Sequence, residues 1–243
     1  MPIEYDCDLL QDTDEWRSKK RGLISGSVMK LLITEKTKKI ADNDKVRGII
    51  FELAAQRLQP QLGEDFQSWD MLRGKKEEIL AKDLYSKNYA QVKDCGLIIN
   101  DDLGFKICCS PDGLVGADGG IEGKSRMSKF QVQTIIEGVV PDEFMCQVQG
   151  NLLVSGRKWW DFLSYSNGMH MFVKRVEPLA VWQDPLKEAI IAAEKKIQEI
   201  VTQYQEKTKD LVLAPWLDVM SGEDGAVKPS RPAIDPADAL SAG

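Results

Sequence analysis

The sequence predicts an α/β (α+β) fold in which a central mixed β-sheet is flanked by helices. Helical spacing of apolar residues dominates the first third, short apolar runs between turn signals occupy the middle, and helical spacing returns near the end. The chain has 243 residues, 43% of them hydrophobic, which is enough to fill one sizeable core. We therefore expect a single domain over residues 1–219.

The first third predicts helices over residues 14–20, 45–58 and 66–89. The segment Ser25-Gly26-Ser27 is a turn and capping signal before a further apolar stretch. Apolar residues recur at three- or four-residue spacing in the second and third of these helices, so we expect them to point inward. These residues are Ile49, Leu53, Ala54, Leu80, Leu84 and Tyr85.

The middle of the chain is typical of strands and turns. We expect strands over residues 92–99, 104–109, 120–125 and 158–166, with 172–178 as hairpin partner of the last. Asn-Asp-Asp and Ser-Pro-Asp-Gly provide the turn chemistry between the first strands. A helix is expected over 141–154, with three apolar residues on one face: Phe144, Val148 and Leu152.

The last part predicts one long helix followed by a tail. Asp184-Pro185 forms a cap and first-turn signal, and a regular apolar stripe follows it. Residues 220–243 are rich in Gly, Ala, Ser, Pro and Asp, so we expect a disordered tail there. The stripe consists of Leu186, Ile190, Ala193, Ile197, Ile200 and Tyr204.

Cysteine usage and hydropathy favour a cytoplasmic protein. The five cysteines are odd in number and show no C-x-x-C spacing, which indicates free thiols in a reducing compartment. The sequence shows no secretory signal, and its apolar runs fall short of the roughly 20 residues that span a bilayer. We therefore expect no membrane contact.

Charge neither requires nor excludes a nucleic-acid substrate. The net charge of −6 argues against a surface uniformly coated with positive charge. Basic residues cluster at 17–21 and 73–76, a pattern of solvated helix faces as well as of phosphate contacts. Because acidic metal ligands lower the net charge, an acidic total is compatible with a metal-dependent nuclease.

Asp112, Glu122 and Lys124 form the group of residues that predicts a chemical activity. Glu122 and Lys124 are two residues apart in a predicted strand, so their side chains project from the same face, opposite Ile121 and Gly123. Asp112 lies ten residues before Glu122, in the turn after the preceding strand. Two carboxylates suit Mg²⁺ or Mn²⁺, and a neighbouring lysine can stabilise charge on a phosphate. The pattern therefore indicates phosphodiester hydrolysis.

Structural roles for the same residues stay open at this point. Ser-Pro-Asp-Gly is a common turn, and Glu-x-Lys on a strand often forms a salt bridge. Motifs this short recur by accident, so the spacing of Asp112, Glu122 and Lys124 does not decide between structure and catalysis.

Several blocks, in order, resemble one nuclease family. Four blocks look like segments of the lambda exonuclease and YqaJ-type viral recombination nucleases. They are Cys109 to Leu114 (Cys-Ser-Pro-Asp-Gly-Leu), Glu122-Gly123-Lys124, the Cys-Gln-Val-Gln at 146–149 and the Trp-Trp-Asp-Phe at 159–162. Trp16, Lys20, Gly22 and Ile24-Ser25-Gly26-Ser27 are similar to that family's tryptophan, basic residue, glycine and Ile-Thr-Ala-Ser segment. Gly74-Lys75 followed by Glu78 resembles its Gly-Lys-x-x-Glu helix.

This resemblance spans roughly residues 13–165 and implies a restriction-endonuclease-like core of the PD-(D/E)xK superfamily. It implies that Asp112, Glu122 and the Gly123 carbonyl bind the metal and that Lys124 is the catalytic lysine. It also adds two residues to the site, Glu78 and Gln147. Periodicity alone does not choose between Glu77 and Glu78, and a glutamine on a helix surface is the structural alternative for Gln147.

The same resemblance implies a pocket for the 5′-terminal phosphate of DNA, formed by Lys20, Ser27 and Ser110. Hydroxyls and a cation near a helix start suit an anion. Lambda exonuclease has arginine at the position of Lys20. Because lysine lacks the bidentate fork, we expect weaker phosphate binding, or binding shared with Arg21.

The function that the resemblance implies is Mg²⁺-dependent 5′-to-3′ exonuclease activity, with Mn²⁺ able to substitute. The enzyme degrades one strand of linear double-stranded DNA and leaves 3′ single-stranded overhangs for phage-type homologous recombination. A ring-shaped homotrimer and a single-strand annealing protein are the implied partners.

Three other kinds of protein share part of this pattern. A RecB-like nuclease with an iron–sulfur cluster needs four cysteine ligands, and only Cys146 follows Lys124. A restriction-like DNA endonuclease shares the core chemistry and stays open. An inactive DNA-binding protein on a nuclease fold is opposed by the intact Asp112, Glu122 and Lys124.

Overall fold

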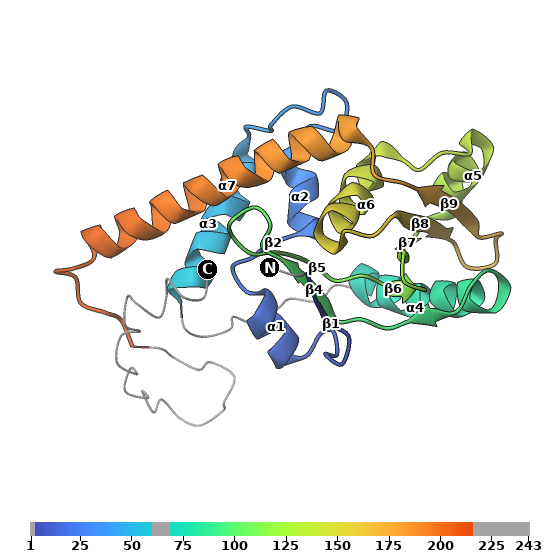
Figure 1. Ribbon diagram of the computed structural model, residues 1–243, viewed down its shortest axis with the longest axis horizontal. Coiled ribbons are helices and arrows are strands. Elements are labelled where there is room, and N and C mark those ends of the chain that lie inside the picture. The colour runs from blue at the N-terminus through green and yellow to red at the C-terminus, as the bar shows by residue number, and fades with distance from the viewer. Residues whose placement is uncertain (1–2, 60–68, 216–243) are drawn as a thin grey trace.

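The computed structural model describes residues 3–59 and 69–215, in which helices flank two β-sheets (Figure 1). The helices are α1 (Asp14–Lys20), α2 (Gly26–Leu32), α3 (Asp44–Leu58), α4 (Trp69–Asn88), α5 (Ser128–Glu137), α6 (Asp142–Ser155) and α7 (Ala180–Lys207). The strands are β1 (Glu4–Asp6), β2 (Ile24–Ser25), β3 (Val92–Lys93), β4 (Leu97–Asn100), β5 (Ile107–Cys109), β6 (Gly113–Val115), β7 (Gly119–Ser125), β8 (Trp159–Tyr165) and β9 (Phe172–Val176).

Both sheets are mixed. The first has the strand order β1-β4-β5-β2, with β2 and β5 parallel and the other pairs antiparallel. The second has the order β3-β6-β7-β8-β9, with β7 and β8 parallel. The predicted fold class, mixed strands flanked by helices, is therefore confirmed, with the strands divided between two sheets.

Helices cover both faces of the second sheet. Helix α4 packs against β7 and β8, where Tyr85 joins a buried cluster with Ile121 and Leu163. On the other face Phe144 of α6 stacks on Phe162 of β8. Helix α6 also contacts β4 and β5 of the first sheet, and α7 runs along α3 (Figure 1). Helix α6 therefore lies where the two sheets meet.

Glycine on β7 permits the tryptophans of β8 to pack flat against the strand. Gly120 is paired in register with Trp160, and a Cβ at Gly120 would lie 2.5 Å from the Trp160 ring. Such a distance is shorter than van der Waals contact, so any larger residue would displace the ring. Because β7 is thus fixed against β8, the functional residues of β7 have a rigid support.

The middle of the chain differs from the prediction in three places. The run expected as one strand over 92–99 forms β3 and β4, which belong to different sheets, because the chain crosses between them at Asp94 to Gly96. The backbone amide of Gly96 there donates to the Asp6 carbonyl. Strand β6 begins at Gly113, inside the expected turn, because it can pair with β7. The sequence pattern also gave no sign of α5.

Helix α7 begins at Ala180, four residues before the expected cap. The amides of Trp182 and Gln183 both donate to the Leu179 carbonyl, and the Trp182 ring is buried. Tertiary burial therefore extends the helix ahead of Pro185, which lies inside the helix, where its missing N–H removes one i→i−4 hydrogen bond. Four residues of the predicted stripe are buried: Leu186, Ile190, Ala193 and Ile197. Tyr204, at its end, is exposed.

The inward face of α4 is narrower than the sequence suggests. Tyr85 is buried as expected, but Leu80 and Leu84 are exposed by 52% and 38%. Helix α4 meets the sheet along one side only, so part of its apolar surface faces outward.

Among the described residues, no helix has the length and hydropathy needed to cross a membrane. The predicted tail over 220–243 lies outside the described residues.

Candidate active site

Glu122 and Lys124 lie side by side on β7, as the strand spacing predicts. The Lys124 Nζ donates to Oε1 of Glu122 over 2.6 Å. Glu122 is 1% exposed, whereas the lysine side chain retains 21% exposure. The carboxylate is therefore fully buried, whereas the lysine side chain keeps some contact with solvent.

Asp112 joins this pair from the connection between β5 and β6. Its Oδ2 accepts a 2.6 Å hydrogen bond from the backbone amide of Gly123. This contact fixes the Asp112 carboxyl beside Gly123, and so beside Glu122 and Lys124 on the same strand. The structure thus brings together the three residues that the sequence nominated.

Helix α6 adds two amides to the site. Nε2 of Gln147 donates to Oε1 of Glu122 over 2.6 Å, so Gln147 is not a simple surface glutamine. One helical turn later, Nδ2 of Asn151 donates to Oε2 of Glu122 over 2.8 Å. Sequence analysis missed Asn151. Its spacing of four from Gln147 was an available signal, since residues four apart share a helix face.

Helix α4 approaches the site through Glu77 and Glu78. The Ser125 hydroxyl donates to Oε2 of Glu77 over 2.5 Å. Glu78 is among the charges that raise the pKa of Asp112 and of Lys124, which places it near both. Glu77 is therefore bonded to Ser125, whereas the charge of Glu78 acts on both Asp112 and Lys124.

The site shows strong electrostatic coupling. Burial raises the pKa of Asp112 well above its usual range, and the negative charge of Glu122 raises it further. For Lys124, burial lowers the pKa, but the charges of Glu122 and Asp112 outweigh it, and the pKa lies above its usual range. The lysine therefore stays protonated, which suits a hydrogen-bond donor and not a general base.

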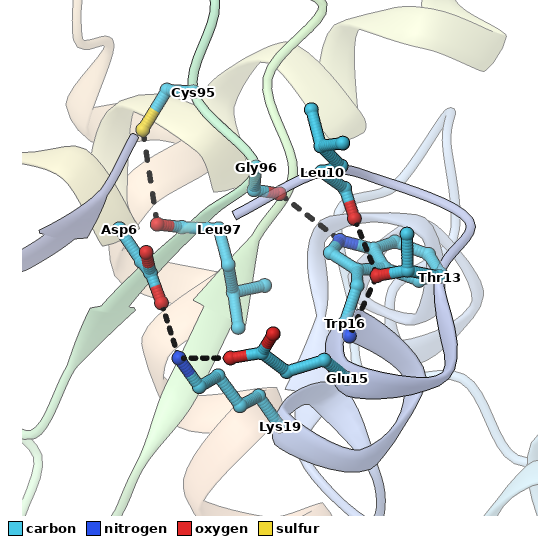
Figure 2. Close-up of polar contacts among 9 residues, drawn as sticks. All are labelled: Asp6, Leu10, Thr13, Glu15, Trp16, Lys19, Cys95, Gly96 and Leu97. Atoms are coloured by element: carbon cyan, nitrogen blue, oxygen red, sulfur yellow. Dashed lines mark hydrogen bonds and ion pairs between the residues drawn. The ribbon is translucent and has the colours of Figure 1, made fainter. Parts of the chain in front are cut away.

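Two of the three residues proposed for a terminal phosphate, Lys20 and Ser110, contact Trp16. The indole N–H donates to Oγ of Ser110 over 3.1 Å, and Nζ of Lys20 lies 4.3 Å from the centre of the Trp16 ring. The indole also donates to the Gly96 carbonyl, a contact drawn in Figure 2. The tryptophan thus holds Lys20 and Ser110 on one side of the first sheet.

Ser27 lies at the start of α2, next to the same strands. Its hydroxyl is 3.0 Å from that of Ser25, and Ser25 pairs with Cys108 in the parallel β2–β5 ladder. Burial is the main cause that raises the pKa of the Cys109 thiol, but Glu122 raises it and Lys20 lowers it as well. The charges of Glu122 and Lys20 therefore both act on the Cys109 thiol.

The donor set fits a small, hard cation. Asp112, Glu122 and the Gly123 carbonyl offer oxygen only, and Mg²⁺ is commonly bound by one or two carboxylates together with substrate phosphates. Within residues 3–59 and 69–215, no group of three His, Cys, Asp or Glu side chains is placed to hold a metal. Any metal here would therefore depend on two carboxylates, a backbone oxygen and the substrate.

The model of one protein family, the YqaJ-like viral recombinase domain, matches residues 15–158. This match covers more than half of the chain and includes Lys20, Asp112, Glu122, Lys124 and Gln147. The chain belongs to this family. A search of curated proteins finds no match.

Solved structures show which folds resemble this member of the YqaJ-like family. An alkaline exonuclease from Laribacter hongkongensis, LHK-Exo, has 25% sequence identity and a TM-score of 0.71, with 82% of this chain and 100% of that chain covered. A complex of LHK-Exo with dAMP gives 24% identity, a TM-score of 0.70 and the same coverage. A phage-related exonuclease from Haemophilus somnus 129PT has a similar fold, at 13% identity, a TM-score of 0.55, and 75% and 96% coverage.

Proposed function

We propose that this protein is a metal-dependent exonuclease of phage type. It degrades one strand of linear double-stranded DNA from the 5′ end and leaves a 3′ single-stranded overhang. The observation that carries the proposal is the Glu122 carboxylate, bonded by Lys124 and Gln147 beside the half-buried Asp112, in a chain of the YqaJ-like family. The similarity to an alkaline exonuclease supports it.

Asp112, Glu122 and the Gly123 carbonyl are the proposed ligands of Mg²⁺, for which Mn²⁺ can substitute. When bound, the metal supplies a water that is more easily deprotonated and a clamp for charge on the phosphate. Lys124 stays protonated beside Glu122 and donates to the attacking water or to the phosphate oxygens, where negative charge grows. Gln147 orients the Glu122 carboxylate, and Glu78 completes the acidic cluster.

The direction of digestion is assigned to the three residues proposed to bind a terminal phosphate. Lys20, Ser27 and Ser110 offer a cation and hydroxyls for a terminal phosphate. A water oxygen bonds to phosphorus, the bond from phosphorus to the 3′ oxygen breaks, and that oxygen takes a proton. The shortened strand then carries a new 5′ phosphate, which the same pocket can accept in the next cycle.

Association with further copies and with a second protein belongs to the proposal. Apolar side chains that monomer folding leaves exposed lie on α4 and α5, among them Leu80 and Ile136, the latter 80% exposed. Surfaces of this kind favour subunit contacts. We propose a homotrimeric ring around DNA and a single-strand annealing protein that receives the overhang, both in the cytoplasm of the host cell.

The test is digestion of linear and covalently closed circular plasmid, with labelled 5′ and 3′ ends, in Mg²⁺, in Mn²⁺ and in excess chelator. Linear duplex should release mononucleotides from the 5′ end only, and chelator should stop the reaction. Asp112→Ala, Glu122→Ala and Lys124→Ala should each abolish release, because each removes part of the charged site.

Lys158→Ala is the matched control, since Lys158 forms an exposed ion pair with Asp118 at the opposite end of the β7–β8 pair. It should digest DNA as the unaltered protein does. Rapid nicking of the closed circle would instead assign the chain to the endonucleases. Full activity in chelator would contradict the metal site, and absence of any release would favour an inactive DNA-binding protein.

A further inference from the structure

Asn151 makes the most deeply buried side-chain contact to the site. The asparagine and Glu122 are each 1% exposed, and Nδ2 of Asn151 donates to Oε2 of Glu122 over 2.8 Å. A buried hydrogen bond to a carboxylate is short, strong and costly to lose. The contact joins α6 to β7 across 29 residues of sequence.

Three side chains donate hydrogen bonds to Glu122, and they are distributed unequally over its two carboxylate oxygens. Lys124 and Gln147 both donate to Oε1, whereas Asn151 donates to Oε2. A carboxylate oxygen has two acceptor sites. The described contacts therefore use both sites of Oε1 and one of Oε2, and Oε2 is the oxygen with capacity left for a cation. Asn151 fixes the orientation of that oxygen.

The side-chain oxygen Oδ1 of Asn151 lies close to Gly26, at the start of helix α2. A Cβ built on Gly26 would lie 2.6 Å from Oδ1 of Asn151, closer than any real contact. Gly150, next to Asn151, likewise faces Met29 of α2, whose Sδ would be 2.9 Å from a Cβ there. Glycine at 26 thus creates the space in which the Asn151 amide reaches Glu122.

We propose that Asn151 is a positioning residue for Glu122 and that Gly26 is the residue that admits it. The inference deepens the proposed function and rests on it, because it assigns Oε2 of Glu122 as the metal-facing oxygen. Gly26 lies between Ser25 and Ser27, so the same segment that bears a proposed phosphate ligand also supports the metal ligand.

The first test is Mn²⁺ binding to the full chain by calorimetry, without DNA. Asn151→Leu keeps the approximate size of the side chain but removes the donor, so the Kd for Mn²⁺ should rise about 10-fold or more, as for other residues that orient metal ligands. Asn100→Leu is the matched control. Asn100 is also buried, but its amide donates to the Val154 carbonyl and not to Glu122.

Asn100→Leu should lower the melting temperature and leave the Kd for Mn²⁺ unchanged. A purely structural role for Asn151 would give both variants the same behaviour. An unchanged Kd in Asn151→Leu, with Mn²⁺ bound normally by the unaltered protein, would overturn the inference alone. Failure of the unaltered protein to bind Mn²⁺ would overturn the proposed metal site and the inference with it.

The second test uses steric rescue and does not depend on how well Asn151→Leu folds. Gly26→Ala should weaken Mn²⁺ binding, because its methyl group displaces Oδ1 of Asn151. Adding Asn151→Ser removes that clash, but its hydroxyl stands where Cγ of Asn151 stood and does not reach Glu122. The double variant should therefore bind Mn²⁺ no more weakly than Asn151→Ser alone, which is non-additivity expected only of directly contacting residues. Additive losses would overturn the role assigned to Gly26.

Discussion

The backbone amide of Gly123 donates a 2.6 Å hydrogen bond to Oδ2 of Asp112. This contact attaches the connection between β5 and β6 to the middle of β7, so the distance between Asp112 and its neighbours on β7 is set by the backbone. The Asp112 carboxyl is consequently held beside Glu122, where desolvation and that neighbouring charge raise its pKa.

Asp112→Asn should abolish nuclease activity and yet stabilise the metal-free protein. Asparagine still accepts from Gly123, but it carries no charge to desolvate. For the carboxyl, stability falls as the pH rises from its unfolded-state pKa, about 3.9, toward the raised folded-state pKa. Thermal melting in chelator between pH 4 and pH 8 should therefore show a smaller loss of stability for Asp112→Asn. Parallel curves for the two proteins would contradict a strained carboxylate.

Lys20→Ala should impair digestion of 5′-phosphorylated duplex far more than of 5′-hydroxyl duplex, since of the two ends only the phosphorylated one offers an anion to the lysine. Lys19→Ala is the matched control, because Lys19 bonds Asp6 at 2.6 Å and Glu15 at 3.3 Å, as Figure 2 shows. Initial rates on the two substrates measure the discrimination. Equal loss on both ends in Lys20→Ala would reassign the residue to general DNA binding or folding.

Tyr85→Phe should lower the free energy of unfolding by about 1.5–3 kcal/mol, as expected for a lost hydrogen bond to a charged group. The buried hydroxyl donates to Asp161 over 2.7 Å, and burial followed by that carboxylate raises its pKa, which keeps it protonated. Urea unfolding measures the effect. Tyr89→Phe alters the exposed ring stacked on Tyr85 and should change little. Similar losses in both variants would argue against the Asp161 contact.

Two glycine-to-alanine substitutions should have opposite effects. Gly48→Ala in α3 meets nothing within 4 Å and should stabilise the protein by about 0.5–1 kcal/mol through helix propensity. Gly120→Ala places a methyl group 2.5 Å from the Trp160 ring and should destabilise it by about 1–3 kcal/mol. Chemical denaturation followed by tryptophan fluorescence compares them. A neutral Gly120→Ala would show that the β7–β8 packing tolerates more volume than the geometry implies.

Local patterns predicted much of the secondary structure and part of the candidate site. Helix spacing located α3, α6 and most of α7, because each has one face against the core. The short α1 was also predicted, although it has no buried residue. Where the contacting surface is narrower than the apolar face, as at Leu80 and Leu84, periodicity overestimated burial. Short strands were harder: β3 and β4 follow one another in a single apolar run, and their separation depends on partners elsewhere in the chain.

The sequence by itself determined that Glu122 and Lys124 share a face, because side chains alternate along any strand. It also determined family membership, since the matching motifs are linear. Only the tertiary structure decided which oxygens of Glu122 are bonded, that Asn151 reaches one of them, and that Gly26 makes room for it. Those contacts join β7, α6 and α2, and their geometry depends on how these elements pack against one another, which no local pattern specifies.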